Sequence, residues 1–188
     1  RLFSPCRCSR SRATTSPLAL RHGPRPMRSR AFTGEAPPVL PDDAREPDTP
    51  VRPEWMDANG HMNLAYYVVV FDLATDALFD ALDLGHAYRE RAGQALFAVE
   101  AHTLYARELR LGQTARVRAR LLGADGKRLH LAHEMFEGEA CCAMQELMFL
   151  HVDLATRRAC PFPPDAAVRL AAAVAGGATV STGMTDVQ

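Results

Sequence analysis

The feature that most constrains the fold is one long apolar segment, Leu64 to Leu82, which follows a short polar turn. Its apolar residues recur at three- and four-residue spacing, the pattern of a buried helix. The main stripe comprises Leu64, Tyr67, Val68, Phe71, Thr75, Leu78 and Leu82, widened by Val70, Ala74, Ala77 and Ala81. We therefore expect a helix that is buried over most of its circumference and capped by Asn63.

Three aspartates interrupt this segment at four-residue spacing: Asp72, Asp76 and Asp80. Like charges one helical turn apart repel each other mildly, so tertiary packing must hold this helix. The aspartates also break the apolar run before it reaches the roughly 18 to 20 residues of a membrane span. The sequence therefore predicts no membrane segment.

From Gln94 the pattern changes to alternation, the period of half-buried strands. Four long strands are predicted, at Gln94–Tyr105, Thr114–Leu122, Arg128–Phe136 and Ala140–Asp153. Turns are predicted at Glu108–Gln113, Gly123–Gly126 and Glu137–Gly138. Shorter elements are an edge strand at Thr49–Glu54, a helical turn at His86–Arg91, a loop at Thr156–Pro164 and a helix at Asp165–Val174.

One helix and one antiparallel sheet of about five strands can bury each other only if the sheet wraps the helix. This α+β arrangement is the hotdog fold, with one long central helix. A single such layer leaves a face or an edge of the sheet uncovered, so we expect a homodimer or a homotetramer.

The chain divides into a basic, Pro-rich leader at 1–48, a hotdog domain at 49–164 and a short helix with a frayed tail at 165–188. The leader lacks helical or strand periodicity and is expected to be disordered. The sequence begins with Arg1, and its first methionine is Met27. We therefore expect the natural protein to begin at Met27.

Charge and cysteine usage exclude several classes of protein. Residues 1–30 hold eight Arg and no acidic residue, whereas the remainder has 14 basic and 22 acidic residues. This acidic remainder argues against nucleic acid as a partner. The five cysteines form no CxxC pair and no even framework, so we expect free thiols in a reducing cytoplasm. His130 and His133 lie three apart on a strand, on opposite faces, so no metal site is expected.

The turn from Trp55 to Asn63 gathers Asp57, Asn59 and His61 at the start of the long helix. Backbone amides at a helix N-terminus can hold an oxyanion, so this turn is a candidate active site. The alternative is that Asp57 and Asn59 only shape the turn and cap the helix.

Two stretches carry a family resemblance: Asp57-x-x-Gly60-His61-Met62-Asn63 and Tyr105-x-Arg107-Glu108-Leu109-x-x-Gly112. With them, the chain from Val51 to Pro164 resembles hotdog acyl-CoA thioesterases of the 4-hydroxybenzoyl-CoA thioesterase type. It is more closely similar to bacterial betainyl-CoA thioesterases of carnitine catabolism. That likeness includes Ala74-Thr75-Asp76-Ala77-Leu78, Gly123-Ala124-Asp125-x-Lys127-Arg128-Leu129-His130-Leu131 and Leu150-His151-Val152-Asp153.

The resemblance implies that Asp57 is the catalytic carboxylate, acting as general base or as nucleophile. The amides of Gly60, His61 and Met62 are then expected to form the oxyanion hole. His61 is expected either to orient substrate or to pack at the helix start. Asn59 is expected to position water, and Asn63 to cap the helix first and contact substrate second.

Further substrate contacts are expected around this turn. Trp55, Tyr66, Tyr67 and Phe71 could face a betainyl ammonium group, with help from Glu54 or Asp72, or could be ordinary core aromatics. Glu100 and His102 share a strand face and could project toward a partner subunit, where family sites lie, or form an exposed ion pair. The CoA phosphates could meet Arg116, Arg118, Arg120, Lys127 or Arg128, although a solvated edge is the alternative.

We therefore interpret the chain as a cytoplasmic, cofactor-free thioesterase whose substrate is a small acyl-CoA, with betainyl-CoA favoured. One alternative is a hotdog enoyl-CoA hydratase, because Asp57-x-Asn59-x-His61 loosely resembles the Asp/His dyad of that group. In that motif a Pro usually stands where this chain has Gly60. Another is a non-catalytic acyl-CoA-binding module, which would be expected to carry an output domain.

Overall fold

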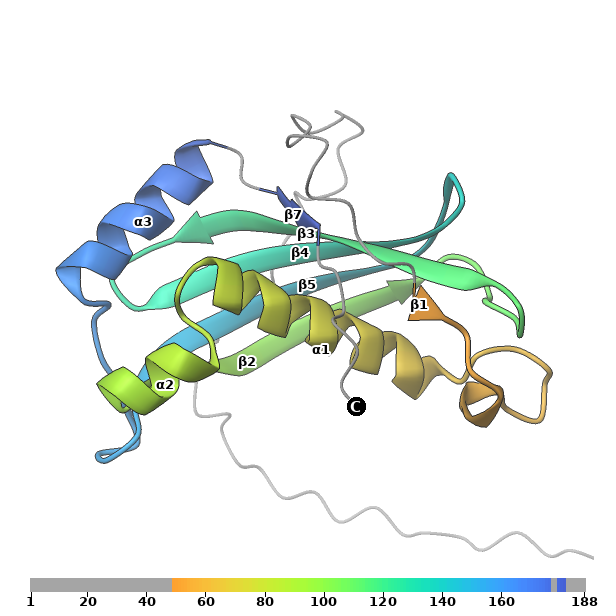
Figure 1. The fold of residues 1–188 in the computed structure, drawn as a ribbon, viewed down its shortest axis with the longest axis horizontal. Helices are drawn as coiled ribbons and strands as arrows, with labels where there is room; N and C mark the ends of the chain where they lie inside the picture. Colours follow the sequence, from red (N-terminus) through yellow and green to blue (C-terminus); the bar gives the residue numbers. More distant parts are fainter. Residues whose placement is uncertain (1–48, 177–178, 182–188) are drawn as a thin grey trace, which may run out of the picture.

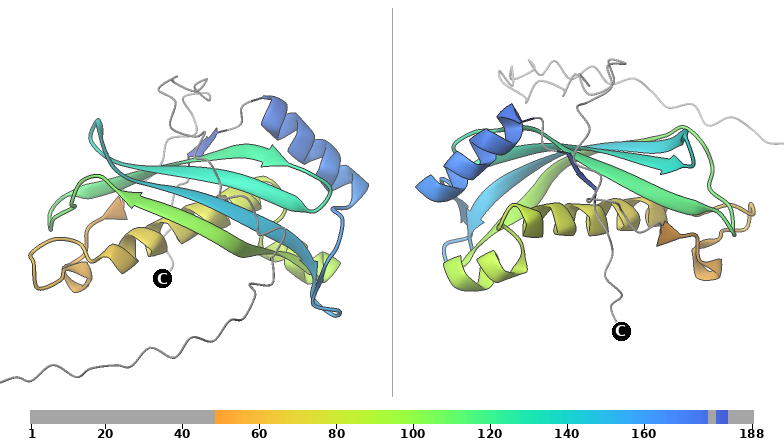
Figure 2. Two further views of the ribbon diagram at one scale, coloured as in Figure 1. Left: turned by 180° about the vertical axis from the view of Figure 1, so that it is seen from behind. Right: turned by 45° about the horizontal axis from the view of Figure 1, so that its top comes forward.

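The computed structural model describes residues 49–176 and 179–181. A curved antiparallel sheet covers one side of a long helix, α1 (Leu64–Ala81), as Figures 1 and 2 show. The main strands are β2 (Gln94–Tyr105), β3 (Thr114–Ala124), β4 (Arg128–Glu137) and β5 (Ala140–Asp153). Shorter elements are β1 (Thr49–Pro50), a 3-10 helix at Pro53–Trp55, α2 (His86–Ala92), β6 (Arg158–Ala159), α3 (Pro164–Ala175) and β7 (Thr179–Ser181). This is the hotdog fold, as predicted.

The strand order is β1-β3-β4-β5-β2, with β6 added to β5 and β7 added to β3. Both β2 and β5 have the predicted bounds, because alternation is a strong local signal. The turn predicted at Glu108–Gln113 is part of a longer crossing connection, 106–113. It carries the chain from β2, at one side of the sheet, to β3, at the other.

Two apolar clusters follow α1 along the sheet. Around its first half, Phe71 packs with Met135 and Val117. Around its second half, Leu78 packs with Leu129 of β4 and with Leu170 of α3.

The structure corrects the predicted orientation of α1. Its side chains are buried on one face only, at Tyr67, Val70, Phe71, Ala74, Thr75, Leu78 and Phe79. Leu64 and Val68, which were placed on the buried stripe, are 64% and 41% exposed. Because the segment is apolar nearly all round, periodicity alone could not select the face that meets the sheet.

Two shorter segments also differ from prediction. The edge strand expected at Thr49–Glu54 is only two residues long, because Pro53 begins a 3-10 helix. Proline has a fixed φ and no amide hydrogen, which suits a first helical turn and not a strand. Near the C-terminus, where a frayed tail was expected, β7 pairs with β3. The leader at 1–48, with Met27, lies outside the described residues.

No helix within the described residues is long and apolar enough to cross a membrane.

Candidate active site

The turn before α1 is a tight hairpin. Met56 and Met62 form an antiparallel bridge, and the Asp57 amide donates to the His61 carbonyl at 3.0 Å. The Gly60 amide closes the hairpin by donating to the Asp57 carbonyl at 3.1 Å. Gly60 has a φ of +80°, a conformation that a side chain would strain. The backbone therefore fixes the directions in which the Asp57 and His61 side chains leave the turn.

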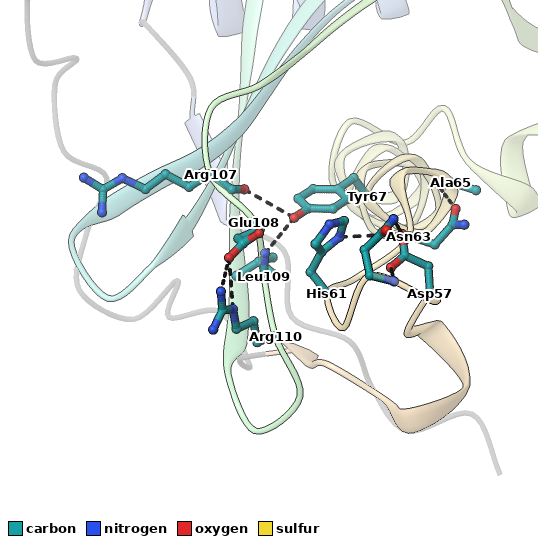
Figure 3. Close-up of polar contacts among 10 residues, drawn as sticks. Asp57, His61, Asn63, Ala65, Tyr67, Arg107, Glu108, Leu109 and Arg110 are labelled. Carbon is teal, nitrogen blue, oxygen red and sulfur yellow. Dashed lines mark hydrogen bonds and ion pairs between the residues drawn. The ribbon is translucent and has the colours of Figure 1, made fainter.

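The Asp57 carboxylate is held at both oxygens. Its Oδ1 accepts from the Asn59 amide at 2.8 Å, and its Oδ2 accepts from Asn59 Nδ2 at 3.3 Å. His61 Nδ1 lies 3.6 Å from Oδ2 (Figure 3). Desolvation acts to raise the pKa of Asp57, but the Asn59 hydrogen bonds and the nearby His61 outweigh it, so the pKa lies below its usual range. Asp57 is therefore an ionised, partly exposed carboxylate at neutral pH.

The predicted oxyanion donors are only partly available. The Gly60 amide is used within the hairpin, and the Met62 amide donates to the Leu109 carbonyl at 2.6 Å. Among the described residues, the amides of His61 and of Leu64, the first residue of α1, have no such acceptor. These hydrogen bonds disfavour the prediction that the Gly60 and Met62 amides donate to substrate, because both amides already hold the local structure together.

Asn63 caps α1 as predicted. It has an extended backbone, with φ −60° and ψ 140°, and its Oδ1 accepts from the Ala65 amide at 3.0 Å. The cap satisfies one of the amides of the first turn, and the Leu64 amide has no backbone acceptor within the described residues.

The Tyr67 hydroxyl joins α1 to the crossing connection. It accepts from the Leu109 amide at 2.8 Å and donates to the Arg107 carbonyl at 3.3 Å (Figure 3). The Tyr67 residue is 3% exposed. It was expected to bind substrate, but its position makes it a structural residue, because both its hydrogen-bonding roles are filled within the chain.

The aromatic residues beside the turn also contact one another. Trp55 stacks on Tyr66 with ring centroids 5.4 Å apart, and the guanidinium of Arg52 lies 5.2 Å from the Trp55 ring centroid. Trp55 thus already has a cation–π partner. This disfavours the expectation that Trp55 and Tyr66 receive the cation of a substrate.

Glu100 and His102 are exposed on β2 and do not meet Asp57 within one chain. His102 lies opposite Glu146, and Glu146 lies opposite Ala132. The residue after Ala132, His133, stacks on Phe71 of α1 and therefore lies on the face of the sheet that meets the helix. Because side chains alternate between the two faces of a strand, Ala132, Glu146 and His102 lie on the other face, away from α1 and from the turn.

The basic row of β3 lies on that same far face. Arg118 and Arg120 both approach Glu134, at 3.8 and 3.7 Å. Arg128 pairs with Asp125 across the next hairpin. These contacts favour structural ion pairs on the sheet over a prepared phosphate site.

Sequence reasoning missed a cavity of about 420 Å³ beside the second half of α1. The helix contributes Asp72, Asp76 and Asp80 to its lining, and residues of α2, β2 and β5 complete the lining. The aspartate row was visible in the sequence, but the cavity exists only once β2 has folded against the helix.

Comparison with known proteins identifies the family. The model of the thioesterase-like superfamily matches residues 51–170. A betainyl-CoA thioesterase of Pseudomonas aeruginosa is 41% identical over 128 residues, which are 66% of this chain and 80% of that protein. An L-carnitine dehydrogenase/betainyl-CoA thioesterase of Ruegeria pomeroyi is 36% identical over 126 residues, 65% of this chain but only 26% of the longer protein.

Solved structures agree with this result. A putative thioesterase from Pseudomonas putida is 36% identical, with a TM-score of 0.59 over 68% of this chain and 82% of that one. A Staphylococcus aureus protein solved in complex with CoA is 27% identical, with a TM-score of 0.65 over 75% and 87% of the two chains. Sequence and fold agree, and the chain belongs to the thioesterase-like superfamily.

Proposed function

We propose that this thioesterase hydrolyses the thioester of a small acyl-CoA, favours betainyl-CoA, and uses Asp57 as its catalytic carboxylate. One observation carries the proposal. The ionised Asp57 carboxylate lies in a tight hairpin directly before the start of α1, where the amides of His61 and Leu64 have no backbone acceptor among the described residues.

The chemistry follows from these groups. The substrate carbonyl oxygen accepts from the His61 and Leu64 amides, where the positive end of the helix dipole favours the negative charge that develops. Asp57 either removes a proton from the attacking water or attacks the carbonyl carbon itself. The tetrahedral intermediate collapses by expelling the CoA thiolate. In the general-base route the thiolate takes up the proton that Asp57 removed from water; in the nucleophilic route water then hydrolyses the mixed anhydride on Asp57, which releases the acid and restores the carboxylate. Asn59 and His61 keep Asp57 ionised and aimed, and no cofactor is required.

The relatives support the choice of substrate. Two of them, from Pseudomonas aeruginosa and Ruegeria pomeroyi, carry betainyl-CoA thioesterase activity in their names. The structural neighbour in complex with CoA supports a CoA thioester. Within the described residues, Cys141, Cys142 and Cys160 are free thiols, which supports the reducing cytoplasm as the compartment.

We also propose that two copies pair antiparallel through β2 to form at least a dimer. β2 ends the main strand order of the sheet and is exposed from Ala98 to His102. Val99, at a bulge in this strand, is 54% exposed. An open edge of this length favours strand pairing. The uncovered apolar residues of α1 support further contact between copies: Leu64, Val68, Val69 and Leu73.

A thiol-release assay over a panel of acyl-CoAs tests the proposal. We expect CoA release from betainyl-CoA, and we expect Asp57→Asn to lower kcat at least about a hundredfold. Asp165→Asn, the same substitution on exposed α3, is the matched control and should leave kcat unchanged.

The alternatives give different results in the same assay. Water addition to crotonyl-CoA without CoA release would support the enoyl-CoA hydratase. Binding of every acyl-CoA without turnover would support a non-catalytic module. Near-normal activity of Asp57→Asn would assign the catalytic role to another group.

A further inference from the structure

Leu109, in the crossing connection, uses both of its backbone groups to join α1 to the hairpin of Asp57. Its amide donates to the Tyr67 hydroxyl at 2.8 Å, and its carbonyl accepts from the Met62 amide at 2.6 Å. All three residues are buried, with Tyr67 3%, Leu109 0% and Met62 1% exposed. A continuous chain of hydrogen bonds, the Tyr67 relay, therefore runs from the Tyr67 side chain to the backbone of the active-site turn.

The Tyr67 hydroxyl orients the chain where it enters Leu109. Besides accepting from the Leu109 amide, it donates to the Arg107 carbonyl at 3.3 Å, so one hydroxyl holds the peptide groups on both sides of Glu108 (Figure 3). Burial of the Leu109 side chain keeps this residue in the core, but burial has no preferred direction and does not orient a peptide plane. Hydrogen bonds are directional. The Tyr67 hydroxyl is therefore what aims the Leu109 carbonyl at Met62.

The Met62 amide belongs to the peptide plane that follows His61. The carbonyl of the same plane is that of His61, which accepts from the Asp57 amide at 3.0 Å, so the plane is held at both ends. The preceding plane carries the His61 amide, an oxyanion donor in the proposed mechanism. Its other neighbour carries the Gly60 amide, which donates to the Asp57 carbonyl. The direction of the His61 amide thus depends on two anchored neighbours, and the Tyr67 relay supplies one of the anchors.

We propose that Tyr67 is a positioning residue for thioester hydrolysis. Through Leu109 and Met62, its hydroxyl holds the His61 amide and the Asp57 carboxylate in the geometry that the transition state requires. The proposal rests on the proposed thioesterase function and extends it to a buried residue that does not touch substrate. A displacement of about 1 Å at the reacting groups can cost about a hundredfold in rate, so loss of one anchor should be visible in turnover.

The chain contains a matched control for the loss of a buried tyrosine hydroxyl. Tyr88, on α2, is 4% exposed, and its hydroxyl donates to Gln94 Oε1 at 2.7 Å and lies 2.8 Å from His151 Nε2. Helix α2 follows the other end of α1, away from the hairpin (Figure 1). Tyr88→Phe therefore removes a comparably buried hydroxyl with two partners and leaves the Tyr67 relay intact.

Steady-state hydrolysis of betainyl-CoA, at a temperature where urea titration shows every variant to be folded, tests the proposal. We expect Tyr67→Phe to lower kcat at least about tenfold and to change KM less than about twofold, because the relay acts on the reacting groups. Tyr88→Phe should leave both values within about twofold of those of the unmodified protein.

A backbone substitution removes the same hydrogen bond without changing Tyr67. Replacing Leu109 with the α-hydroxy acid of the same side chain converts its amide to an ester, which cannot donate to the Tyr67 hydroxyl. It should reproduce the loss of kcat, and it takes the place of Tyr67→Phe in the comparison if that variant does not fold. A normal kcat in the ester variant would overturn the proposal.

Hydrogen exchange reports on the hairpin without any turnover. The Asp57 and Gly60 amides donate within the hairpin, and the Met62 amide donates to Leu109. We expect fragments that cover residues 56–62 to take up deuterium at least about fivefold faster in Tyr67→Phe and at the normal rate in Tyr88→Phe. Normal uptake in Tyr67→Phe would show that the hydroxyl does not hold the hairpin and would overturn the proposal.

The positioning role and the thioesterase function fail in different ways. No CoA release from any acyl-CoA of the panel by the unmodified protein would overturn the thioesterase function, and the positioning role with it. Normal turnover by the unmodified protein and a normal kcat in Tyr67→Phe would overturn the positioning role alone. Equal losses of kcat in Tyr67→Phe and Tyr88→Phe would assign Tyr67 to general stability, and a raised KM with unchanged kcat would assign it to substrate binding. Either result would also overturn the positioning role.

Discussion

His133 should make the folded protein sensitive to mild acid. It lies on β4, is 0% exposed, and stacks on Phe71 of α1 with ring centroids 5.7 Å apart. Its Nε2 lies 3.5 Å from Thr75 Oγ1, and its Nδ1 has no hydrogen-bond partner within the described part of the chain. Burial lowers the pKa of His133 from 6.5 to about 4, because a protonated ring would lose its hydration.

The sign and size of the effect follow from this shift. Between pH 6.5 and 4 the unfolded chain binds a proton at His133 and the folded chain does not, so acid favours unfolding. The contribution to the free energy of unfolding is fully present above pH 6.5 and is lost as the pH falls to 4. At 1.36 kcal/mol per pKa unit, the total loss is about 3 kcal/mol, of which about 2 kcal/mol is lost by pH 5.

Urea unfolding at several pH values between 5 and 7.5 measures this effect. We expect His133→Leu, which cannot titrate, to lose about 2 kcal/mol less stability than the unmodified protein between pH 7.5 and pH 5. His86→Gln is the control, since the His86 side chain is 74% exposed, and its curve should parallel that of the unmodified protein. Parallel curves for His133→Leu would refute the reasoning, because they would show that the buried ring does not resist protonation.

Two further predictions concern the framework of the active site. Tyr67→Phe should lower the free energy of unfolding by about 1–3 kcal/mol, because the buried Leu109 amide loses its acceptor. Tyr105→Phe is the control: it loses only an exposed 3.4 Å contact and should lower the free energy of unfolding by less than about 1 kcal/mol in the same urea titration. Equal losses would contradict the structural role of Tyr67. Asn63→Ala should lower the free energy of unfolding by about 1 kcal/mol and should also lower kcat, because fraying of the first turn displaces the Leu64 amide. Asn63→Ser keeps a capping oxygen and should retain most of the stability and most of kcat. An equally impaired Asn63→Ser would argue against the cap.

Much of the fold could be predicted because its signals are local. Alternation defined β2 and β5 to the residue, and the Asn63 cap defined the start of α1. The polar turn at Asp57 was recognisable because a carboxylate, a glycine and a capping residue lie within seven positions of the sequence. These properties depend on φ/ψ preference, capping and periodicity, which act over a few residues.

Which backbone amides and side chains remain available to substrate could not be predicted in the same way. Met62 and Tyr67 were expected to face substrate, but both are engaged by the crossing connection at Leu109, which is 42 residues from Tyr67 in the sequence. The buried face of α1 was likewise predicted only in part, since Leu64, placed on the buried stripe, is 64% exposed, whereas Phe79, which was left off it, is 7% exposed.

The sequence by itself thus determined the order of the main helix and the four long strands, and the polar turn with its carboxylate, because each depends on neighbours along the chain. Only the tertiary structure decided which helix-start amides have acceptors within the described residues, which aromatic residues are structural, and that the aspartates of α1 line a cavity. Each of these depends on contacts between segments that are distant in sequence, and no local pattern carries that information.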